Sequence, residues 1–275
     1  MDVTGKTILI TGAASGIGEA LALECARRGA SVALADIDLA GAEQTQAGCL
    51  AAGTADVSIT AHQLDVANLA QWRSLKDLLL KHHGAIDGII NNAGVTFTGT
   101  VEHTPYEQLD RVMAINFMGM VYGTKEFLSH LKGRPEAVIA NVSSVFGLYP
   151  MRNQSAYCAS KFAIRGFTEV LAQELKGTSI AVSTIHPGHI GTDIVKNALH
   201  QTDTSKSPLS RAQQEAWADG FKALGMNPAQ AAVDILAGLK KKKRKIVVGR
   251  DAKRGDRLSR LFPGWFIDSA NRAAP

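Results

Sequence analysis

The chain has 275 residues, of which 45% are hydrophobic and 20% are charged, a composition that fits a globular protein with a large core. Its longest apolar stretches, such as residues 88–90, are far too short to span a bilayer, and the first residues carry no signal-peptide pattern. Three cysteines cannot all pair with one another and show no metal-ligand spacing, so we expect no metal site and a reducing, cytoplasmic setting.

The net charge of +5 comes from one short segment. Six positive residues form the run 240–245, and without them the net charge changes from +5 to −1. A nucleic-acid-binding surface over the whole chain is therefore not indicated. The run itself could attract an anionic lipid or a nucleic acid, or act as a localisation signal, but we favour a solvated turn between a helix and the strand-like residues 246–248.

Strand-like and helix-like segments alternate along most of the chain. The predicted strands cover residues 7–10, 31–35, 57–64, 86–90, 137–142 and 180–185. The predicted helices cover residues 17–28, 39–51, 69–81, 106–131 and 156–175. This alternation is typical of βαβ units. We therefore predict one α/β domain over residues 1–275, a doubly wound, Rossmann-like parallel sheet of about seven strands with helices on both faces.

Residues 188–225 interrupt this alternation. The segment is long, polar and only weakly periodic, which is the composition of a mobile loop. We predict that it is a substrate-binding loop or lid.

A glycine-rich turn, TGAASGIG, occupies residues 11–18 between the first strand and the first helix. Glycines let backbone N–H groups approach an anion, and the following helix directs its positive end towards it. Asp36 ends the second strand, 18 residues beyond Gly18. Because a carboxylate at that place accepts hydrogen bonds from an adenosine ribose, the sequence predicts a dinucleotide site.

Asp36 also discriminates between dinucleotides. A ribose 2′-phosphate would meet its negative charge, and neither Ser15 nor Ile37 supplies a compensating cation, so we expect NAD rather than NADP. Asp65, which ends the third strand, is placed either to meet the adenine amino group or to belong to the start of the helix after Asn68.

Tyr157 and Lys161 lie four residues apart in SAYCASK, residues 155–161, so a helix would place them on one face. A phenol has a reference pKa of about 10, and a fixed positive charge beside it favours the phenolate that acid/base chemistry needs. Alone, this spacing is more often that of an amphipathic surface turn. Ser144 follows the strand 137–142 and is expected to face the glycine turn and NNAG, residues 91–94, across one crevice at the carboxyl ends of the strands.

Several motifs occur together between residues 11 and 192. They are TGAASGIG, Asp36, NNAG, Asn116, NVSS with Ser144, YCASK, and Pro187–Gly188 followed by Thr192. Together they resemble the short-chain dehydrogenase/reductase family in its compact form. The resemblance implies that Tyr157 is the general acid/base and that Lys161 lowers its pKa and binds the nicotinamide ribose. It also implies that Ser144 polarises the substrate oxygen and that Asn116 anchors a water between Lys161 and solvent.

The glycine turn and the resemblance together predict the residues that contact NAD. Besides Tyr157 and Lys161, they are Gly12, Ser15, Gly16, Ile17, Gly18, Asp36, Asp65, Val66, Asn92, Ala93, Gly94, Pro187, Gly188, Ile190 and Thr192. Three positions keep a second interpretation: Ser143 competes with Ser144, Asn92 also suits a tie between strands, and Asn116 also suits a kink or a buried amide. His186 and His189 match no motif, and we assign them no catalytic role.

The predicted function is NAD-dependent hydride transfer to or from a secondary alcohol or ketone. Residues that follow strand ends are mostly apolar and suggest a substrate with hydrophobic bulk: Phe97, Phe146, Leu148, Tyr149, Met151 and His189. Two alternatives are a nucleotide-sugar epimerase or dehydratase, whose relatives are longer with another glycine spacing, and a non-catalytic dinucleotide sensor, whose relatives usually lack the Tyr/Lys pair.

Two expectations concern assembly. The resemblance implies a homodimer or homotetramer joined through residues 106–131 and 156–175. The tail at residues 261–267 is unusually apolar, and could dock on its own subunit, a neighbouring subunit or a membrane surface, with docking on protein the default.

Overall fold

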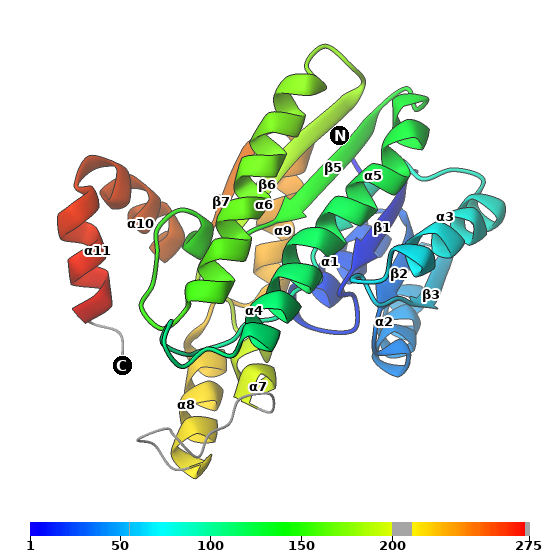
Figure 1. Cartoon of the computed structure of the whole chain (residues 1–275). Helices are drawn as coiled ribbons and strands as arrows, with labels where there is room; N and C mark the ends of the chain where they lie inside the picture. Colours follow the sequence, from blue (N-terminus) through cyan, green and yellow to red (C-terminus); the bar gives the residue numbers. More distant parts are fainter. Residues whose placement is uncertain (55, 200–210, 273–275) are drawn as a thin grey trace.

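The described residues, 1–54, 56–199 and 211–272, form a seven-stranded parallel sheet in a computed structural model of the chain (Figure 1). The strand order is β3-β2-β1-β4-β5-β6-β7. The strands are β1 (Thr7–Thr11), β2 (Ser31–Asp36), β3 (Ile59–Gln63), β4 (Gly88–Asn91), β5 (Ala137–Val142), β6 (Ile180–Pro187) and β7 (Lys245–Val248). The predicted doubly wound α/β fold is confirmed.

The strand order reverses between β1 and β4. From β1 the chain winds outwards through β2 and β3, then crosses back to β4 and winds the other way. Connections after β1 and β4 therefore leave in opposite directions and open a crevice at the carboxyl ends of the two strands. The glycine turn after β1 and the NNAG segment after β4 meet at that place.

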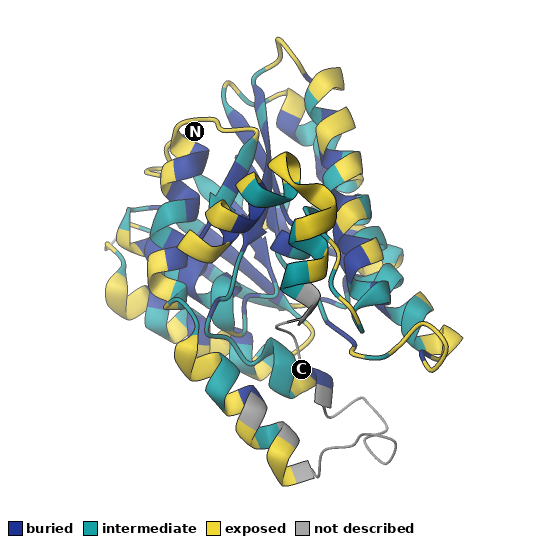
Figure 2. Cartoon of the chain, turned by 90° about the vertical axis from the view of Figure 1, so that its left-hand side faces the viewer, coloured by how far each residue is buried: buried dark blue, intermediate teal, exposed yellow. Residues whose placement is uncertain are grey.

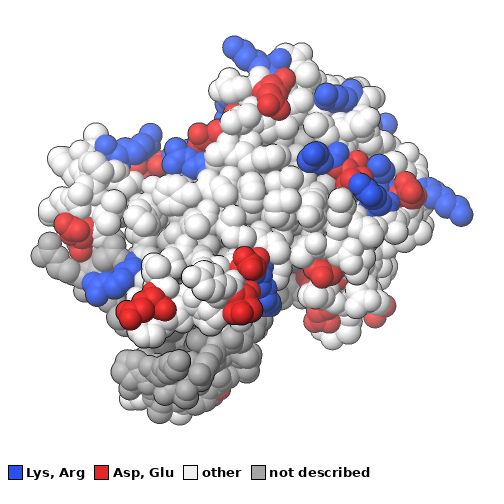
Figure 3. All heavy atoms as spheres, viewed as in Figure 1, with Lys and Arg blue, Asp and Glu red and all other residues white. Residues whose placement is uncertain are grey.

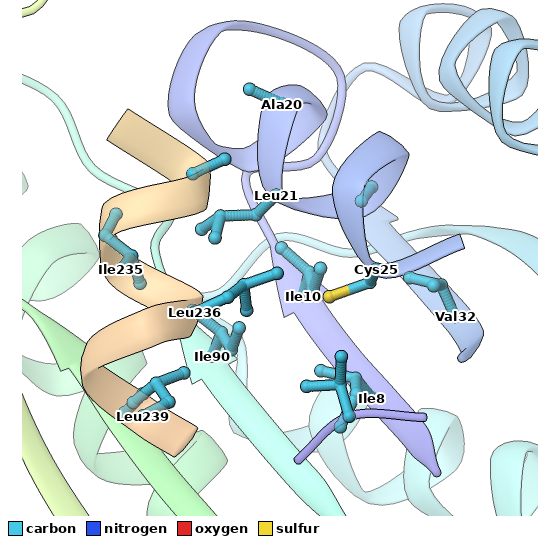
Figure 4. Close-up of a cluster of buried hydrophobic side chains, with 14 of the residues drawn as sticks. Ile8, Ile10, Ala20, Leu21, Cys25, Val32, Ile90, Ile235, Leu236 and Leu239 are labelled. Atoms are coloured by element: carbon cyan, nitrogen blue, oxygen red, sulfur yellow. The ribbon is translucent and has the colours of Figure 1, made fainter. Parts of the chain in front are cut away.

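Helices cover both faces of the sheet. One layer contains α1 (Gly16–Arg27), α2 (Leu39–Ala52) and α9 (Pro228–Lys240), and the other contains α3 (Leu69–His83), α5 (Gly119–Lys132) and α6 (Ser155–Glu174). The strands alternate their side chains between the two layers: in β1, Ile8 and Ile10 join the first core, whereas Leu9 joins the second. Figure 4 shows the first core, where β1 packs against Leu21 of α1 and Leu236 of α9.

The predicted helix 106–131 is divided into three parts. Helix α4 (Tyr106–Met113) is followed by a single π-helical turn, Ala114–Met118, and then by α5. Asn116 lies within this turn and is buried. Both the local irregularity and the buried amide that the sequence suggested are therefore present, as is common where a π turn supports a functional site.

The prediction of a loop over residues 188–225 is wrong for most of the described part. This part contains α7 (Ile194–Leu199) and α8 (Arg211–Leu224), while residues 200–210 lie outside the described residues. Ion pairs join the two helices, with Lys222 Nζ 2.7 Å from Asp193 Oδ2 and Lys196 Nζ 3.1 Å from Asp219 Oδ1. Polar and charged residues recur along α8, and this polarity led to the prediction of a loop, although Ala, Gln, Glu and Lys all favour a helix.

The basic run connects α9 to β7, as predicted for a solvated turn. Two of its lysines pair with nearby acids, Lys240 with Asp2 at 2.8 Å and Lys242 with Glu136 at 2.7 Å. On the face seen in Figure 3, positive and negative side chains are interspersed. Within the described residues, no helix combines the length and apolarity that crossing a membrane requires.

Two helices follow β7 that the sequence pattern did not predict, α10 (Arg250–Leu261) and α11 (Pro263–Arg272). Helix α10 carries charged residues at seven of its twelve positions, so it contains few apolar residues that would indicate a helix packed on the core. In Figure 1 the two helices lie beside the β7 edge of the sheet, and Figure 2 views the molecule from that side, with the strands buried behind them.

Candidate active site

Two hydrogen bonds tie the carboxyl end of β5 to α6. The Ser143 hydroxyl donates to the backbone carbonyl of Lys161 at 2.8 Å, and Lys161 Nζ donates to the carbonyl of Val142 at 3.0 Å. Gly147 lies against the same turn of α6, where a Cβ would come within 2.7 Å of the Lys161 carbonyl oxygen. The strand end that carries Ser144 is thereby held next to the turn of α6 that carries Tyr157 and Lys161.

The structure separates Ser143 from Ser144, which the sequence left as competing candidates. The Ser143 hydroxyl is buried and donates to α6, whereas the Ser144 side chain acts on the Tyr157 phenol and lowers its pKa. Ser144 Oγ also accepts from the Phe146 amide at 3.2 Å, and the Ser144 carbonyl lies 2.9 Å from His186 Nδ1. Ser144 is thus oriented on both sides, and His186 supports its backbone.

Burial shifts the pKa values of Tyr157 and Lys161 in opposite directions. Lys161 is 3% exposed, and desolvation lowers the pKa of its ammonium group to about 8. Desolvation raises the pKa of Tyr157 to about 12, although the hydrogen bond with Ser144 opposes this rise. The net Tyr157 shift is opposite to that expected from Lys161 alone, because desolvation of the buried phenol is its largest cause. The Lys161 ammonium group donates to the Val142 carbonyl and lies 5.4 Å from the phenol ring centroid.

Asn116 and Lys161 meet beside Gly94. A Cβ at Gly94 would lie 3.2 Å from Asn116 Oδ1 and 3.3 Å from Lys161 Nζ. The Asn116 amide pairs with the Val95 backbone, accepting from its N–H at 2.8 Å and donating to its carbonyl at 2.9 Å, and it also donates to Ser160 Oγ at 3.0 Å. Asn116 and Lys161 are therefore neighbours, and the amide is held by the segment after β4 and by α6.

The glycine turn packs directly against the segment after β4. Gly12 has φ +66°, and a Cβ there would lie 2.8 Å from Ala93 Cα, so a side chain fits neither the conformation nor the space. Asn92 Nδ2 donates to the carbonyls of Thr11 at 3.0 Å and Gly12 at 3.1 Å. Asn92 therefore ties neighbouring strands together, which was its second interpretation. The Thr11 hydroxyl, which the sequence did not single out, accepts from the amides of Asn92 and Ala93.

The N-terminus of α1 fits a phosphate group. Ser15 stands at the N-cap position but makes no side-chain cap hydrogen bond, so it does not occupy the amides of the first turn. Gly16 faces Thr192 from the loop after β6, since a Cβ at Gly16 would lie 3.0 Å from Thr192 Cγ2. Ile17 and Gly18 continue the turn into the helix, where a Cβ at Gly18 would collide with the Gly12 carbonyl.

Asp36 lies at the carboxyl end of β2 and has a structural role besides the predicted one. Its Oδ2 accepts from the Ala14 amide at 2.9 Å, and its Oδ1 accepts from the Asp38 amide at 3.0 Å. The carboxylate thus orders the glycine turn while remaining partly exposed. None of the ion pairs within the described part of the chain includes Asp36, so its negative charge is not neutralised there.

Asp65 and Val66 form the turn that precedes α3. Asp65 Oδ1 accepts from the Ala67 amide at 2.9 Å, whereas the N-cap of α3 is Asn68. Val66 is buried, and its carbonyl accepts from Trp72 Nε1 at 2.9 Å. Their contact with adenine stays a prediction.

The loop after β6 is held by an acid that the sequence reasoning missed. The Gly188 amide donates to the Val248 carbonyl at 2.9 Å, continuing the sheet beyond Pro187. The Asp251 carboxylate accepts from the His189 amide at 2.7 Å and fills the space where a Cβ of Gly188 would lie. The sequence could have indicated Asp251, because it is an acidic residue that closely follows the end of a strand. Ile190 is buried two residues after Gly188.

A row of aromatic rings leads from Tyr157 to α11. Ring centroids are 6.2 Å apart for Tyr157 and Phe146, 6.3 Å for Phe146 and Tyr149, and 4.9 Å for Tyr149 and Phe266. Of the predicted pocket residues, Phe146 therefore lies next to the phenol and Tyr149 lies next to Phe146. The structure adds Phe266, so part of the apolar tail docks on its own subunit.

The other predicted pocket residues are placed differently. Phe97 belongs to a small core with Val112 and Ala156, and the Met151 amide approaches Cys158 Sγ at 3.5 Å. His189 Nε2 lies 2.6 Å from the Phe221 carbonyl of α8, and the His189 ring packs against the Phe221 ring. Leu148 follows the short turn after Ser144 and is partly buried.

Comparisons with known proteins agree on one family. The model of the short chain dehydrogenase family matches residues 6–203. The Mycobacterium tuberculosis protein named "Putative oxidoreductase SadH" is 36% identical over 262 residues, covering 94% of this chain and 91% of that protein. The levodione reductase of Leifsonia aquatica is 31% identical over 231 residues, covering 84% and 86%. A solved short-chain dehydrogenase/reductase from Burkholderia phymatum in complex with NAD has a TM-score of 0.85 and 26% identity, covering 100% and 99%.

The buried Lys161 predicts a specific pH dependence of stability. Between pH 8 and 10.5 the unfolded chain binds the Lys161 proton that the folded protein has released, so the free energy of unfolding rises with pH through this window. Relative to Lys161→Met, wild-type stability should increase by on the order of 3 kcal/mol across the window. Urea unfolding at several pH values measures this difference, with the exposed Lys125→Met as the control. A constant difference between wild type and Lys161→Met would contradict the burial of a charged amine.

Proposed function

The chain belongs to the short-chain dehydrogenase/reductase family, and we propose that it is an NAD-dependent oxidoreductase that interconverts a secondary alcohol and a ketone. The observation that carries this proposal is the grouping of three side chains: Ser144 acts on the Tyr157 phenol and lowers its pKa, and Lys161 lies beside the Tyr157 ring. Two hydroxyl groups that converge in this way suit a single substrate oxygen. The bound dinucleotide supplies the hydride exchange at its nicotinamide ring.

In the reducing direction, Tyr157 donates its phenolic proton to the substrate carbonyl oxygen. A pKa of about 12 keeps the phenol protonated at neutral pH, which suits an acid. Ser144 donates a hydrogen bond to the same oxygen and orients it. Lys161 and Asn116, which meet beside Gly94, hold the route by which the Tyr157 proton is replaced from solvent.

In the oxidising direction, the phenolate must accept the alcohol proton, so the Tyr157 pKa must fall below its value in the free protein. Positive charge brought close to the phenol has this effect. Lys161 can supply this charge, because its ammonium group is already held 5.4 Å from the ring centroid. The same amine is proposed to bind the nicotinamide ribose, so its loss should impair cofactor binding as well as proton transfer.

The cofactor proposal rests on residues that fit a dinucleotide. The uncapped start of α1 suits the pyrophosphate, and the unpaired carboxylate of Asp36 suits the adenosine ribose. A 2′-phosphate would meet that carboxylate without a neighbouring cation, which favours NAD over NADP. The NAD complex of the Burkholderia phymatum relative supports the same choice.

The substrate is proposed to carry apolar bulk next to its reacting carbon. Phe146 lies next to Tyr157, Tyr149 lies next to Phe146, and Phe266 of α11 extends this apolar wall. The relative named levodione reductase supports a ketone as one form of the substrate. Residues 188–225, including α7 and α8, are proposed to provide the opposite side of the substrate site.

We further propose a homodimer or homotetramer in a reducing, cytoplasmic setting. Phe162 and Val170 on α6 are exposed apolar residues on one of the helices expected to join subunits. The three cysteines are unpaired and buried, which suits a reducing compartment. Sedimentation as a monomer at micromolar concentration would contradict the assembly.

The activity test compares Tyr157→Phe with wild type over a panel of secondary alcohols with NAD and ketones with NADH. Removing the hydroxyl removes the proton donor, so kcat/KM should fall by at least about a thousandfold for every substrate turned over. Tyr106→Phe, at an exposed tyrosine of α4, is the matched control and should retain activity. Unchanged turnover in Tyr157→Phe would refute the acid/base role.

The two adjacent serines should respond in opposite ways. Ser144→Ala removes the group beside the phenol and should lower kcat by about a hundredfold while changing stability little. Ser143→Ala removes the hydrogen bond to the Lys161 carbonyl and should lower the free energy of unfolding by about 1 kcal/mol, with a much smaller effect on kcat. Kinetics and urea unfolding of both variants check this. A larger kcat loss in Ser143→Ala would overturn the assignment.

Asp36 should determine the cofactor preference. Wild type should bind NADH at least about tenfold more tightly than NADPH, as measured by fluorescence titration. Asp36→Asn keeps an oxygen that can accept from the Ala14 amide but loses the charge, so the preference should shrink. The neighbouring Asp38→Asn removes an equal charge and should leave the ratio unchanged. Equal affinities of the wild-type protein for NADH and NADPH would contradict the proposed role of Asp36.

A further inference from the structure

The junction of α10 and α11 presents an apolar tip, formed by Leu261, Phe262 and Trp265. Their exposed fractions are 70%, 56% and 61%. The Phe262 and Trp265 rings lie 6.5 Å apart in an edge-to-face arrangement, so they form one surface rather than scattered positions. These helices face the viewer in Figure 2. Contiguous exposed apolar surface of this kind marks a place where a partner docks.

A cationic stripe on α10 leads to this tip. Arg250, Lys253, Arg254 and Arg257 follow the spacing i, i+3, i+4 and i+7, which places them on one face, and Leu261 continues the same face. All four side chains belong to exposed residues, and none forms an ion pair within the described part of the chain.

The acidic residues of α10 are turned away from the stripe. Asp251 accepts from the His189 amide at the active-site loop. Asp256 is largely buried, and its carboxylate pairs with Lys245 at 2.6 Å and Arg260 at 2.8 Å. The outward face of α10 therefore carries net positive charge without internal compensation.

We propose that α10 and α11 dock the protein on the surface of an anionic lipid bilayer. The stripe complements negatively charged headgroups, and the tip complements the apolar region just beneath them. Trp and Phe are the side chains that favour the boundary between headgroups and hydrocarbon. The resulting attachment is peripheral, with the helices lying on the membrane.

The tip is presented on a fixed support. Phe266 packs on Tyr149 at 4.9 Å between ring centroids, and Tyr149 packs on Gly255, where a Cβ would lie 2.8 Å from its ring. These contacts hold both helices against the body of the protein, so docking requires little further ordering of the chain.

Two other occupants fit the same face less well. A second copy joined by a two-fold axis through this face would bring identical cationic stripes together. A nucleic acid would neutralise the stripe but would leave the apolar tip without a matching surface. The bilayer alone complements both features.

The test is flotation of the full-length protein with vesicles of phosphatidylcholine, with and without about 30 mol% phosphatidylglycerol. We expect the protein to float with the anionic vesicles only. Because salt screens charge–charge attraction, about 0.5 M NaCl should release most of the bound protein. Phe262→Ser combined with Trp265→Ser, and separately Lys253→Glu combined with Arg254→Glu, should each reduce the bound fraction by about tenfold.

Matched controls change the same chemistry elsewhere. Val101→Ser combined with Leu50→Ser removes exposed apolar groups, and Lys241→Glu combined with Lys243→Glu changes the same amount of charge in the basic run; both should float like wild type. Brominated lipids should quench wild-type tryptophan fluorescence more than that of Trp265→Phe. These readouts need no turnover, so they are independent of the proposed activity.

Several results would overturn the proposal. The first is that the protein does not float with anionic vesicles. The second is that the control variants lose as much vesicle binding as the α10 and α11 variants. The third is that brominated lipids quench the fluorescence of Trp265→Phe as much as that of wild type. Loss of a dimer in Phe262→Ser/Trp265→Ser, seen by sedimentation without a change in flotation, would assign the face to a second copy. Binding to an oligonucleotide that the tip variant leaves intact, in place of vesicle binding, would assign the stripe to nucleic acid.

Discussion

The pair of hydrogen bonds between β5 and α6 is the constraint on which the site depends. Ser143 reaches from the strand to the backbone of Lys161, and the side chain of Lys161 reaches back to the carbonyl of Val142. The two bonds cross-link a strand end to the second turn of a helix, so Ser144 and Tyr157 meet without relying on a flexible loop. Precise placement of two hydroxyl groups is what a proton-transfer site needs, because small displacements of reacting groups cost large factors in rate.

The same constraint buries two groups that are costly to bury. Desolvation lowers the pKa of Lys161 to about 8 and raises that of Tyr157 to about 12, so each is driven towards its neutral form. Burying these two groups lowers the stability of the folded protein, and the apolar cores on both faces of the sheet offset this loss. A buried amine within reach of a buried phenol, at the carboxyl end of a sheet, is the pattern expected of a functional site rather than of a structural ion pair.

Several residues serve structure and proposed chemistry together. Asp36 orders the glycine turn through the Ala14 amide and offers its remaining charge to a ribose. Asp251 begins α10 and holds the loop after β6 at Gly188, so the C-terminal helices are connected to the cofactor side of the site as well as to the substrate side through Phe266. The proposed attachment of α10 and α11 to a bilayer would therefore place the active site at a defined distance from the membrane surface.

The sequence alone determined the α/β class and the main site, because these depend on local patterns. Strand–helix alternation follows from periodicity, and the Tyr157/Lys161 face follows from four-residue helical spacing. The glycine turn between a strand and a helix predicts a phosphate site in the same way. The resemblance to the dehydrogenase family rested on these motifs, and the match over residues 6–203 confirmed it.

Only the tertiary structure decided the features that depend on contacts between residues far apart in the sequence. Ser143 and Ser144 are the same residue type at adjacent positions, so the sequence cannot distinguish them. The structure does so, because the Ser143 hydroxyl donates to the backbone carbonyl of Lys161, 18 residues further along the chain. The direction of the Tyr157 pKa shift depends on how completely the surrounding elements exclude water. Helices α8 and α10 are polar along most of their length, so their partners, Asp193 on another segment and Tyr149 under Gly255, are absent from any local pattern. Local periodicity reports which face of an element is apolar; it carries no information about which distant residue that face will meet.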